Sequence, residues 1–448
     1  MNMLVRNAQG YAPAFQASDI TTKEMRKAII DWVDLYFHNT PTEHEDPCQR
    51  IPYTIVRRLT KAVFAEYSTA SQNKYAEGIL HSLKDKCSVA MQTALITGES
   101  LIKPIPAKDG FRFMIVPRYN VLIFGRDAEG NITDVGMIEQ TAKGNCYYTL
   151  LERRTIDGEG VLTIRYRLFK AYNQENLGTE VPLGSLEQYS QLQPEYTFPN
   201  PVGSVGLASL KTPIANCVDG SADGVSVYAA AAGLIHNINR NEALLNGEFD
   251  RGQSRVIVSR DMLQTKDGQK TFDETLFVGL DDDPDTTGIT IFNPTLREAS
   301  YLARKQEYLR NVENVIGLKR GLLSEVEVAE RTATEITSSA GEYNLTVIEF
   351  QQAWEKTLRE LLQICAVLGE MYKIPNACEI KEEDVAVSWG NGILYDEEKT
   401  WTDYKDMVAK GLLKPEIAVG WYFDLPTDTE ENLANVRKMM PTMLEEVD

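Results

Sequence analysis

Three glycine-containing runs are the first places where this sequence could carry chemistry. Gly206 stands before Lys211 and Thr212, an arrangement that superficially suggests a phosphate-binding loop. Such a loop cradles phosphate with the backbone N–H groups of a glycine-rich turn, which here requires glycine at positions 205 and 210. Those positions hold Val205 and Leu210, so the sequence predicts no phosphate loop.

The other two runs are also incomplete. Gly390 and Gly392 begin like a dinucleotide fingerprint, but its third glycine is missing and no strand–helix–strand unit surrounds the run. Gly224 and Ser226 begin like a nucleophile elbow, which needs glycine where Tyr228 stands. Neither run predicts a catalytic or cofactor-binding site.

Metal ligands are not arranged in a recognisable pattern. The chain has four histidines, and no two of them have the spacing of a zinc-binding helix. The acidic run 281–285 could bind a cation, but an EF-hand needs glycine and glutamate where Thr286 and Phe292 stand. A solvated turn is the favoured interpretation. We therefore expect no catalytic residue, no metal and no cofactor, and we predict that the protein is not an enzyme.

The charge balance limits how the chain can meet nucleic acid. Its net charge is −19, from 65 acidic and 46 basic residues among 448. Lysine and arginine contacts to phosphate dominate tight binding to DNA, and this composition provides no basic excess for them. From Glu379 onward the net charge is −10. The protein therefore either avoids nucleic acid or lies near it without adhering.

Membrane and secretion signals are not apparent. No apolar run approaches the length of about 18 residues that suggests a membrane span, and the N-terminus does not contain the uninterrupted apolar segment of a signal peptide. The six cysteines form no C-x-x-C pair. We expect reduced, mostly buried thiols in a cytosolic product.

The longest element predicted is a helix over residues 332–372. Its apolar side chains recur every three or four residues, and Thr332 with Glu335 has the spacing of a capping box. Such a helix is about 60 Å long, whereas globular helices average about 11–12 residues. The apolar positions are Ile336, Ala340, Tyr343, Val347, Phe350, Trp354, Leu358, Leu361, Cys365, Leu368 and Tyr372. A helix of this length usually braces an elongated subunit or an assembly.

The N-terminal half of the chain reads as helices followed by an antiparallel β-rich lobe. Residues 1–18 are predicted to be a flexible arm, and helices then start after Thr21, which has Glu24 three residues on, at Pro52 and at Lys74. The period changes from 3.6 to 2 after residue 110, and links too short for crossover helices predict antiparallel pairing. Predicted strands are 111–116, 121–124, 132–140, 147–152 and 162–169. Residues 195–213 are predicted to be a loose connection.

The second half returns to helices. We predict helices at 223–249 and 296–316, separated by a small insert with strands at 255–258, 277–280 and 289–292. A loop over 317–330 precedes the long helix, and short acidic helices near 396–410, 415–423 and 428–440 follow it. The fold class is α+β, mainly helical.

This order of elements resembles the portal proteins of tailed bacteriophages, especially the long-tailed phages of Gram-positive hosts. The resemblance extends from about Thr21 to Met440. The segments that carry it are Leu245–Phe249 running into Arg255–Val258, Asn293–Arg297, Arg331–Glu335 and Val408–Leu412.

The resemblance implies a division of the chain into portal segments. These are an arm at 1–18, a wing at 19–222, a first stem helix at 223–250, a clip at 251–295, a second stem helix at 296–316, a tunnel loop at 317–331, a long kinked wing helix at 332–378 and an acidic crown at 379–448.

It also implies a function without catalytic residues. Portal proteins form a ring, a dodecamer in the virion, at one capsid vertex, after assembly in the host cytoplasm. Double-stranded DNA passes through the ring without sequence specificity during packaging and ejection. The implied partners are terminase, which hydrolyses the ATP, scaffolding and major capsid proteins, and head-completion proteins; no membrane is involved.

Two other classes stay open at this point. A nucleic-acid enzyme, such as a nuclease or motor subunit, is disfavoured because the phosphate loop and a metal cluster are missing. Another capsid or head-completion protein is the alternative within the structural class.

The tunnel loop is where DNA contact is expected. Each phosphate contact adds affinity through counterion release, so a channel that lets DNA slide must limit such contacts. Lys319 and Arg320 are the candidates for limited phosphate contact, and Glu325, Glu327 and Glu330 would oppose adhesion. A loop of mixed charge opened by Gly317 is also expected to move without disrupting a core.

Overall fold

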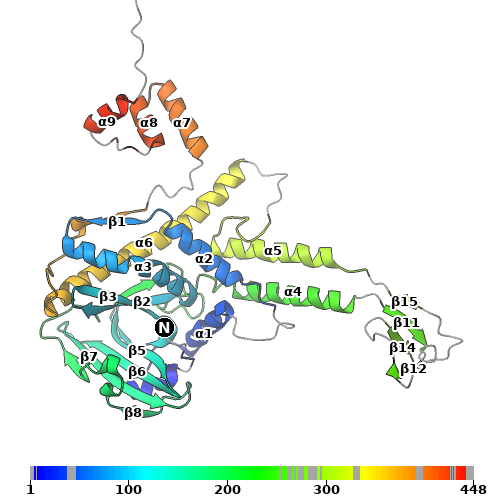
Figure 1. The fold of residues 1–448 in the computed structure, drawn as a ribbon, viewed down its shortest axis with the longest axis horizontal. Coiled ribbons are helices and arrows are strands. Elements are labelled where there is room, and N and C mark those ends of the chain that lie inside the picture. Colours follow the sequence, from blue (N-terminus) through cyan, green and yellow to red (C-terminus); the bar gives the residue numbers. More distant parts are fainter. Residues whose placement is uncertain are drawn as a thin grey trace, which may run out of the picture. The chain divides into compact units, whose positions relative to one another are not determined.

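The chain folds into two compact units, residues 1–390 and residues 391–448 (Figure 1). The computed structural model describes residues 5–6, 8–37, 47–252, 255–259, 265–266, 269–270, 277–280, 290–292, 295–325, 333–389, 397–423, 425, 427 and 430–439. Within these ranges no helix is long and apolar enough to cross a lipid bilayer.

The largest apolar cluster of the first unit is built mainly from helices. Helices α1 (Lys23–Phe37), α2 (Ile51–Val63), α3 (Lys74–Thr97) and α6 (Ala333–Met371) contribute to one large apolar cluster. The long helix is confirmed, and from Val347 to Leu368 its predicted apolar stripe is buried. Tyr372, the last member of that stripe, follows the helix end and is 38% exposed. The proposed capping residues Thr332 and Glu335 lie outside the residues whose side chains are described.

Two antiparallel sheets form the β-rich lobe, as predicted. The larger contains β4 (Val121–Arg126), β5 (Ile132–Lys143), β6 (Cys146–Ile156), β7 (Leu162–Ala171) and β8 (Thr179–Val181), in that order, and β9 (Glu195–Thr197) also pairs with β7. The smaller has the order β10-β2-β3, built from β10 (Ala208–Lys211), β2 (Glu99–Ala107) and β3 (Gly110–Pro117). The five predicted strands fall within β3 to β7. Strand β2 was missed because Pro104 and Pro106 interrupt its alternation.

The predicted flexible arm and loose connection are both wrong for the described residues. A 3₁₀ helix at Ala8–Phe15 packs on the larger sheet, where Tyr11 and Phe15 are buried beside Leu151 and Phe169. These aromatic side chains find an apolar sheet face, which fixes the segment. Residues 195–213 contribute β9 and β10, with Leu207 and Ala208 buried, so this stretch is part of the fold rather than a linker.

The cap of α1 and the burial of the cysteines also differ from prediction. Thr22, not Thr21, accepts the Met25 N–H at 3.1 Å, whereas Thr21 is buried and accepts a hydrogen bond from Arg118 at 2.7 Å. Of the six free cysteines, only Cys87 and Cys365 are buried, so the thiols are not mostly buried.

The first predicted stem helix begins later than expected. Helix α4 runs from Ala232 to Arg251, and residues 223–231 are not helical, with 223–228 buried. The Val227 N–H and the Ser226 hydroxyl both donate to the Leu95 carbonyl at 3.0 Å, and the Tyr228 hydroxyl donates to the Trp32 carbonyl at 2.9 Å. These tertiary hydrogen bonds replace the helical ones that the apolar spacing predicted.

A small β insert connects α4 to α5 (Glu298–Ile316). Its described strands are β11 (Arg255–Ser259), β12 (Thr265–Lys266), β13 (Gln269–Lys270), β14 (Phe277–Leu280) and β15 (Thr290–Phe292). One sheet has the order β14-β11-β15, and β12 pairs with β13. The predicted strands are confirmed, while the acidic run 281–285 lies outside the described residues.

The second unit is helical. It contains α7 (Glu397–Ala409), α8 (Pro415–Tyr422) and α9 (Glu430–Arg437), close to the predicted positions. The rings of Trp401 and Tyr422 pack with centroids 4.6 Å apart. Strand β16 (Val385–Ser388) belongs to the first unit, where it pairs with β1 (Ser68–Ser71), so the second unit begins after the predicted boundary at 379.

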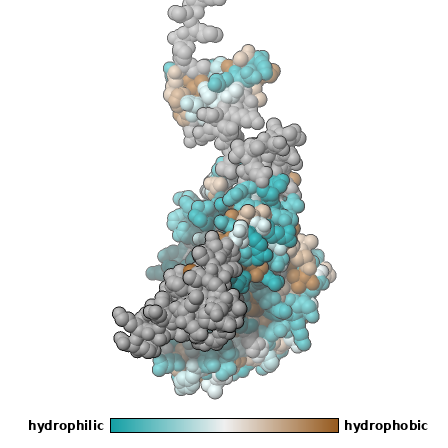
Figure 2. Space-filling model, turned by 90° about the vertical axis from the view of Figure 1, so that its right-hand side faces the viewer, coloured by the Kyte–Doolittle hydropathy of each residue, from teal (hydrophilic) through white to brown (hydrophobic). Residues whose placement is uncertain are grey.

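The first unit shows a mainly polar surface on the face seen in Figure 2, with hydrophobic residues in small patches. Hydrophobic residues also appear on the second unit.

Candidate functional site

Helices α4 and α5 form an antiparallel pair (Figure 1) that is joined in part by polar contacts. Lys305 forms an ion pair with Glu242 at 2.8 Å, and Arg297 forms one with Glu248 at 2.7 Å. The Asn241 side chain donates to the Tyr301 carbonyl at 3.0 Å. Glu242, which interrupts the apolar stripe of α4 in the sequence, is therefore explained by its cationic partner on α5.

The same pair leaves apolar side chains in solvent. On α4, Leu244 and Phe249 are 44% and 42% exposed, and on α5, Leu302 and Val315 are 45% and 50% exposed. Two helices alone bury only one stripe of each, so the remaining apolar side chains stay uncovered within one subunit.

A buried carboxylate organises the connection that follows α5. The Glu313 side chain is 1% exposed. One of its oxygens accepts the N–H groups of Gly321, Leu323 and Ser324, at 3.1 Å for Gly321 and 2.9 Å for Ser324, and the other accepts the Ser324 hydroxyl at 2.7 Å. Hydrogen bonds to a charged acceptor are stronger than neutral ones, so Glu313 holds residues 321–324 in one conformation.

Further contacts attach this connection to the body. Leu318 is buried in the main apolar cluster, and Leu322 and Leu323 pack against it. The Arg58 guanidinium of α2 donates to the Leu322 carbonyl, and the Thr346 hydroxyl of α6 donates to the Gly317 carbonyl at 3.3 Å. The expectation that this loop moves without disrupting a core is therefore wrong for residues 317–325.

The predicted DNA-facing residues can be placed only in part. Lys319, Arg320 and Glu325 are exposed, and the Leu322 N–H donates to the Lys319 carbonyl at 3.1 Å, which closes a turn around the two cations. Glu327 and Glu330 lie outside the described residues. The structure thus brings Lys319 and Arg320 together at the surface of an anchored turn.

Sequence reasoning missed Glu313, although a signal was present. Glu313 stands four residues after Leu309 and three before Ile316, on the apolar stripe of α5. A charged residue at such a position is rarely buried unless it has partners. Its partners are backbone groups of the next segment, and side-chain spacing does not reveal them.

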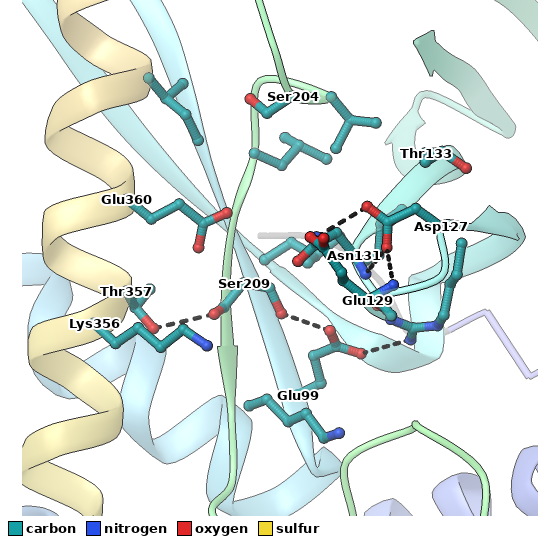
Figure 3. A pocket seen from close by; sticks show the side chains of 18 of the residues that line it. Glu99, Asp127, Glu129, Asn131, Thr133, Ser204, Ser209, Lys356, Thr357 and Glu360 are labelled. Atoms are coloured by element: carbon teal, nitrogen blue, oxygen red, sulfur yellow. Dashed lines mark hydrogen bonds and ion pairs between the residues drawn. The ribbon is translucent and has the colours of Figure 1, made fainter. Parts of the chain in front are cut away.

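A groove of about 1550 Å³ in the first unit lies elsewhere. Figure 3 shows Lys356 and Glu360 of α6 on one side of it and the turn around Asp127–Asn131 on the other. Between them runs β10, whose Ser209 carbonyl accepts the Thr357 hydroxyl at 3.0 Å. These contacts attach α6 to the edge of the smaller sheet.

The wall of this groove contains a buried ionic network. Glu99 and Arg118 are 2% and 1% exposed and lie 3.4 Å apart, and Asp223 bridges Arg118 and Arg126, at 2.9 Å from the latter. Burial raises the pKa of the nearby Glu360 carboxyl, and the charge of Glu99 adds to that rise. The network joins β2, the end of β4 and the turns before α4, which is a structural role. No cluster of three or more histidine, cysteine, aspartate or glutamate side chains that could hold a metal ion occurs among the described residues.

The sequence profile of one protein family covers most of the chain. The family described as "Phage portal protein, SPP1 Gp6-like" matches residues 77–439. The chain belongs to this portal protein family. Portal-family proteins are structural components of bacteriophage-type particles, and the family assigns this chain a role as a portal, or head–tail connector, rather than an enzymatic one.

The remaining comparisons add little to this assignment. No curated protein matches the chain. Among solved structures it is similar to a chain of "Neck of native GTA particle computed with C12 symmetry", at 11% identity and a TM-score of 0.41, covering 94% of this chain and 99% of the other. It is also similar to a chain of "Neck of empty GTA particle computed with C6 symmetry", at 11% identity and a TM-score of 0.44, covering 93% and 98%.

Proposed function

We propose that copies of this chain form a closed ring at one capsid vertex of a virion. The observation that carries this proposal is the α4–α5 pair, whose four large apolar side chains remain 42–50% exposed in a member of the portal family. Neighbouring copies placed around an axis would bury them. Twelve copies is the number implied by the family resemblance.

The ring is proposed to conduct double-stranded DNA without sequence specificity during packaging and ejection. A subunit of net charge −19 repels phosphate, which lets a duplex slide rather than adhere. Residues 317–331 are proposed to line the narrowest part, where Lys319 and Arg320 make limited phosphate contact and Glu325, Glu327 and Glu330 oppose adhesion. Because residues 317–325 are anchored, they would act as a fixed constriction.

The other segments take their proposed roles from chain order. Residues 19–222 and 332–378 form the wing, and α4 and α5 form the stem. Residues 251–295 form a clip that docks terminase and then head-completion proteins, and the acidic second unit forms the crown. The wing is proposed to meet scaffolding and major capsid proteins.

Negative-stain imaging of the purified protein tests the ring. We expect closed rings with a central hole. Monomers or open filaments in every buffer would contradict the proposal.

Charge reversal tests the loop assignment. Changing Glu325 and Glu327 to Lys should increase DNA retention and slow sliding while leaving the ring intact, and the added phosphate contacts should make retention more salt-sensitive. The matched control changes Glu159 and Glu379, two exposed glutamates outside the loop, to Lys. If packaging rate and DNA retention are unchanged in the loop variant at any salt concentration, the loop does not face the duplex.

A further inference from the structure

A pocket of about 490 Å³ lies between α1, α2 and α3, and none of its lining residues belongs to α4, α5 or residues 317–325. Helix α2 and the residue that follows it, Phe64, contribute most of the lining, and α3 contributes two polar side chains. The lining residues are Tyr36, Tyr53, Arg57, Thr60, Lys61, Phe64, Ser88 and Gln92.

The pocket is cationic on a strongly acidic chain. Arg57 and Lys61 are exposed at its edge, and neither forms an ion pair with any described residue. Among the described residues that line it, none is an aspartate or glutamate. Two adjacent cations without a carboxylate favour an anionic ligand.

A buried hydroxyl within the pocket also requires a partner. Thr60 is 3% exposed, and its hydroxyl oxygen makes no hydrogen bond in the structure. A buried polar group without a partner costs free energy, and a ligand, ion or water that accepts or donates a hydrogen bond there removes that cost. The hydroxyls of Thr60 and Ser88 could donate to an anion held by Arg57 and Lys61.

The rim identifies the kind of ligand. Tyr53 lines the pocket and is 46% exposed, and Phe37 and Val89, which follow the lining residues Tyr36 and Ser88 in the sequence, are each 47% exposed. The rings of Tyr36 and Phe37 pack at right angles, 5.0 Å between centroids. Aromatic side chains together with arginine are typical of protein interfaces. The patch therefore fits a protein segment better than a free phosphate or a DNA backbone.

We propose that this pocket receives a carboxylate-bearing segment of a neighbouring copy of the chain. The inference rests on the proposed ring. A ring is closed by a head-to-tail interface, in which two different surfaces of each subunit complement one another. Each copy of the chain has a net charge of −19, so its surface is rich in carboxylates. A cationic pocket with an apolar rim complements such a surface on the neighbouring copy.

The test reverses the charge of the pocket and measures assembly. We would compare the full-length parent with Arg57→Glu/Lys61→Glu by sedimentation velocity across protein and salt concentrations. The concentration at half-assembly should rise about tenfold or more, because like charges would then face each other, while the melting temperature of the subunit stays at the parent value. Lys23→Glu/Lys27→Glu on α1 makes the same charge change at the same spacing and should leave assembly unchanged.

A second variant removes the unpartnered hydroxyl. Thr60→Val keeps the shape of the side chain, so the isolated subunit should be no less stable than the parent, whereas assembly should weaken. A purely structural threonine would show the opposite, a less stable subunit with unchanged assembly.

Three outcomes would overturn the inference while leaving the ring intact. In the first, the parent forms rings and the Arg57→Glu/Lys61→Glu variant has the same concentration at half-assembly as the parent. In the second, that variant has a lower melting temperature with unchanged assembly, and Glu43→Gln/Glu45→Gln/Asp46→Asn lowers the melting temperature by the same amount. This result would mean that acidic residues of the same chain occupy the pocket. The third is loss of binding to a short DNA duplex with unchanged assembly, which would make the pocket a phosphate site. A parent that stays monomeric contradicts the proposed function itself and the inference with it.

Discussion

The long helix α6 and the α4–α5 pair use apolar side chains in different ways. On α6, Phe350, Trp354 and Leu361 are at most 2% exposed, within a core to which α1, α2 and α3 also contribute. On the α4–α5 pair, comparable side chains are 42–50% exposed and two ion pairs join the helices. The apolar stripe of α6 from Val347 to Leu368 is therefore covered within one subunit, although Leu345 and Ile348 of the same helix are exposed, whereas the pair leaves apolar side chains of both its helices exposed.

The largest effect should come from truncating the body. Trp354 is fully buried and donates its indole N–H to the Tyr67 hydroxyl at 3.0 Å. Trp354→Ala should lower the free energy of unfolding by about 3–5 kcal/mol, because it leaves a cavity. Leu302→Ala, on the exposed face of α5, should change it by about 0.5 kcal/mol or less. Urea unfolding measures both, and similar losses in the two variants would remove the distinction between body and pair.

The next effect tests whether the anchored loop belongs to the body. Glu313→Leu removes the acceptor for the amides of Gly321, Leu323 and Ser324, and should cost about 2–3 kcal/mol. Hydrogen exchange at these amides should become much faster. Glu313→Gln keeps a carbonyl oxygen facing the same donors and should show a smaller loss. Exchange at the parent rate in the leucine variant would mean that the carboxylate does not hold the loop.

The pair itself should respond in assembly rather than in stability. Leu244→Ser/Leu302→Ser removes apolar surface that we expect to be covered by a neighbour, so the concentration at half-assembly should rise about tenfold, equivalent to about 1.4 kcal/mol. The unfolding free energy of the subunit should change little. Ile105→Ser, at an exposed position on β2, serves as the control for loss of a surface apolar group.

The smallest effect is a pH dependence in the groove beside α6. Burial raises the pKa of Glu360, with a further contribution from Glu99. A carboxyl with a folded pKa above its unfolded pKa stabilises the folded state at acid pH, and this contribution is lost as the pH rises through the folded pKa. Glu360→Gln should therefore be more stable than the parent at pH 7, by about 0.5 kcal/mol or less. In thermal unfolding the difference should disappear below about pH 4, near the unfolded pKa of glutamate.

The elements with strong periodicity could be predicted from sequence. The stripe from Val347 to Leu368 and the alternation in β7 both gave the correct type of structure, because local spacing alone decides which side chains share a face. The order of these elements also led to the portal family that the sequence profile confirms.

The errors occurred where distant contacts override local patterns. Residues 223–231 have helical spacing, but their donors bond to Leu95 and to the body. The arm at 8–15 finds a sheet face that no local signal announces. Of the candidate site, the exposed charges Lys319 and Arg320 could be predicted, whereas the carboxylate that fixes their turn could not, because its partners are backbone amides.

The central claim is that the α4–α5 pair is covered by neighbouring copies of this chain. Sedimentation velocity at micromolar concentration, in low and high salt, tests it most directly. We expect a closed oligomer, which has a mass of about 600 kDa if it contains the twelve 50.3 kDa subunits implied by the resemblance. We also expect Leu244→Ser/Leu302→Ser to weaken this oligomer. A single 50.3 kDa species in every condition would contradict the claim.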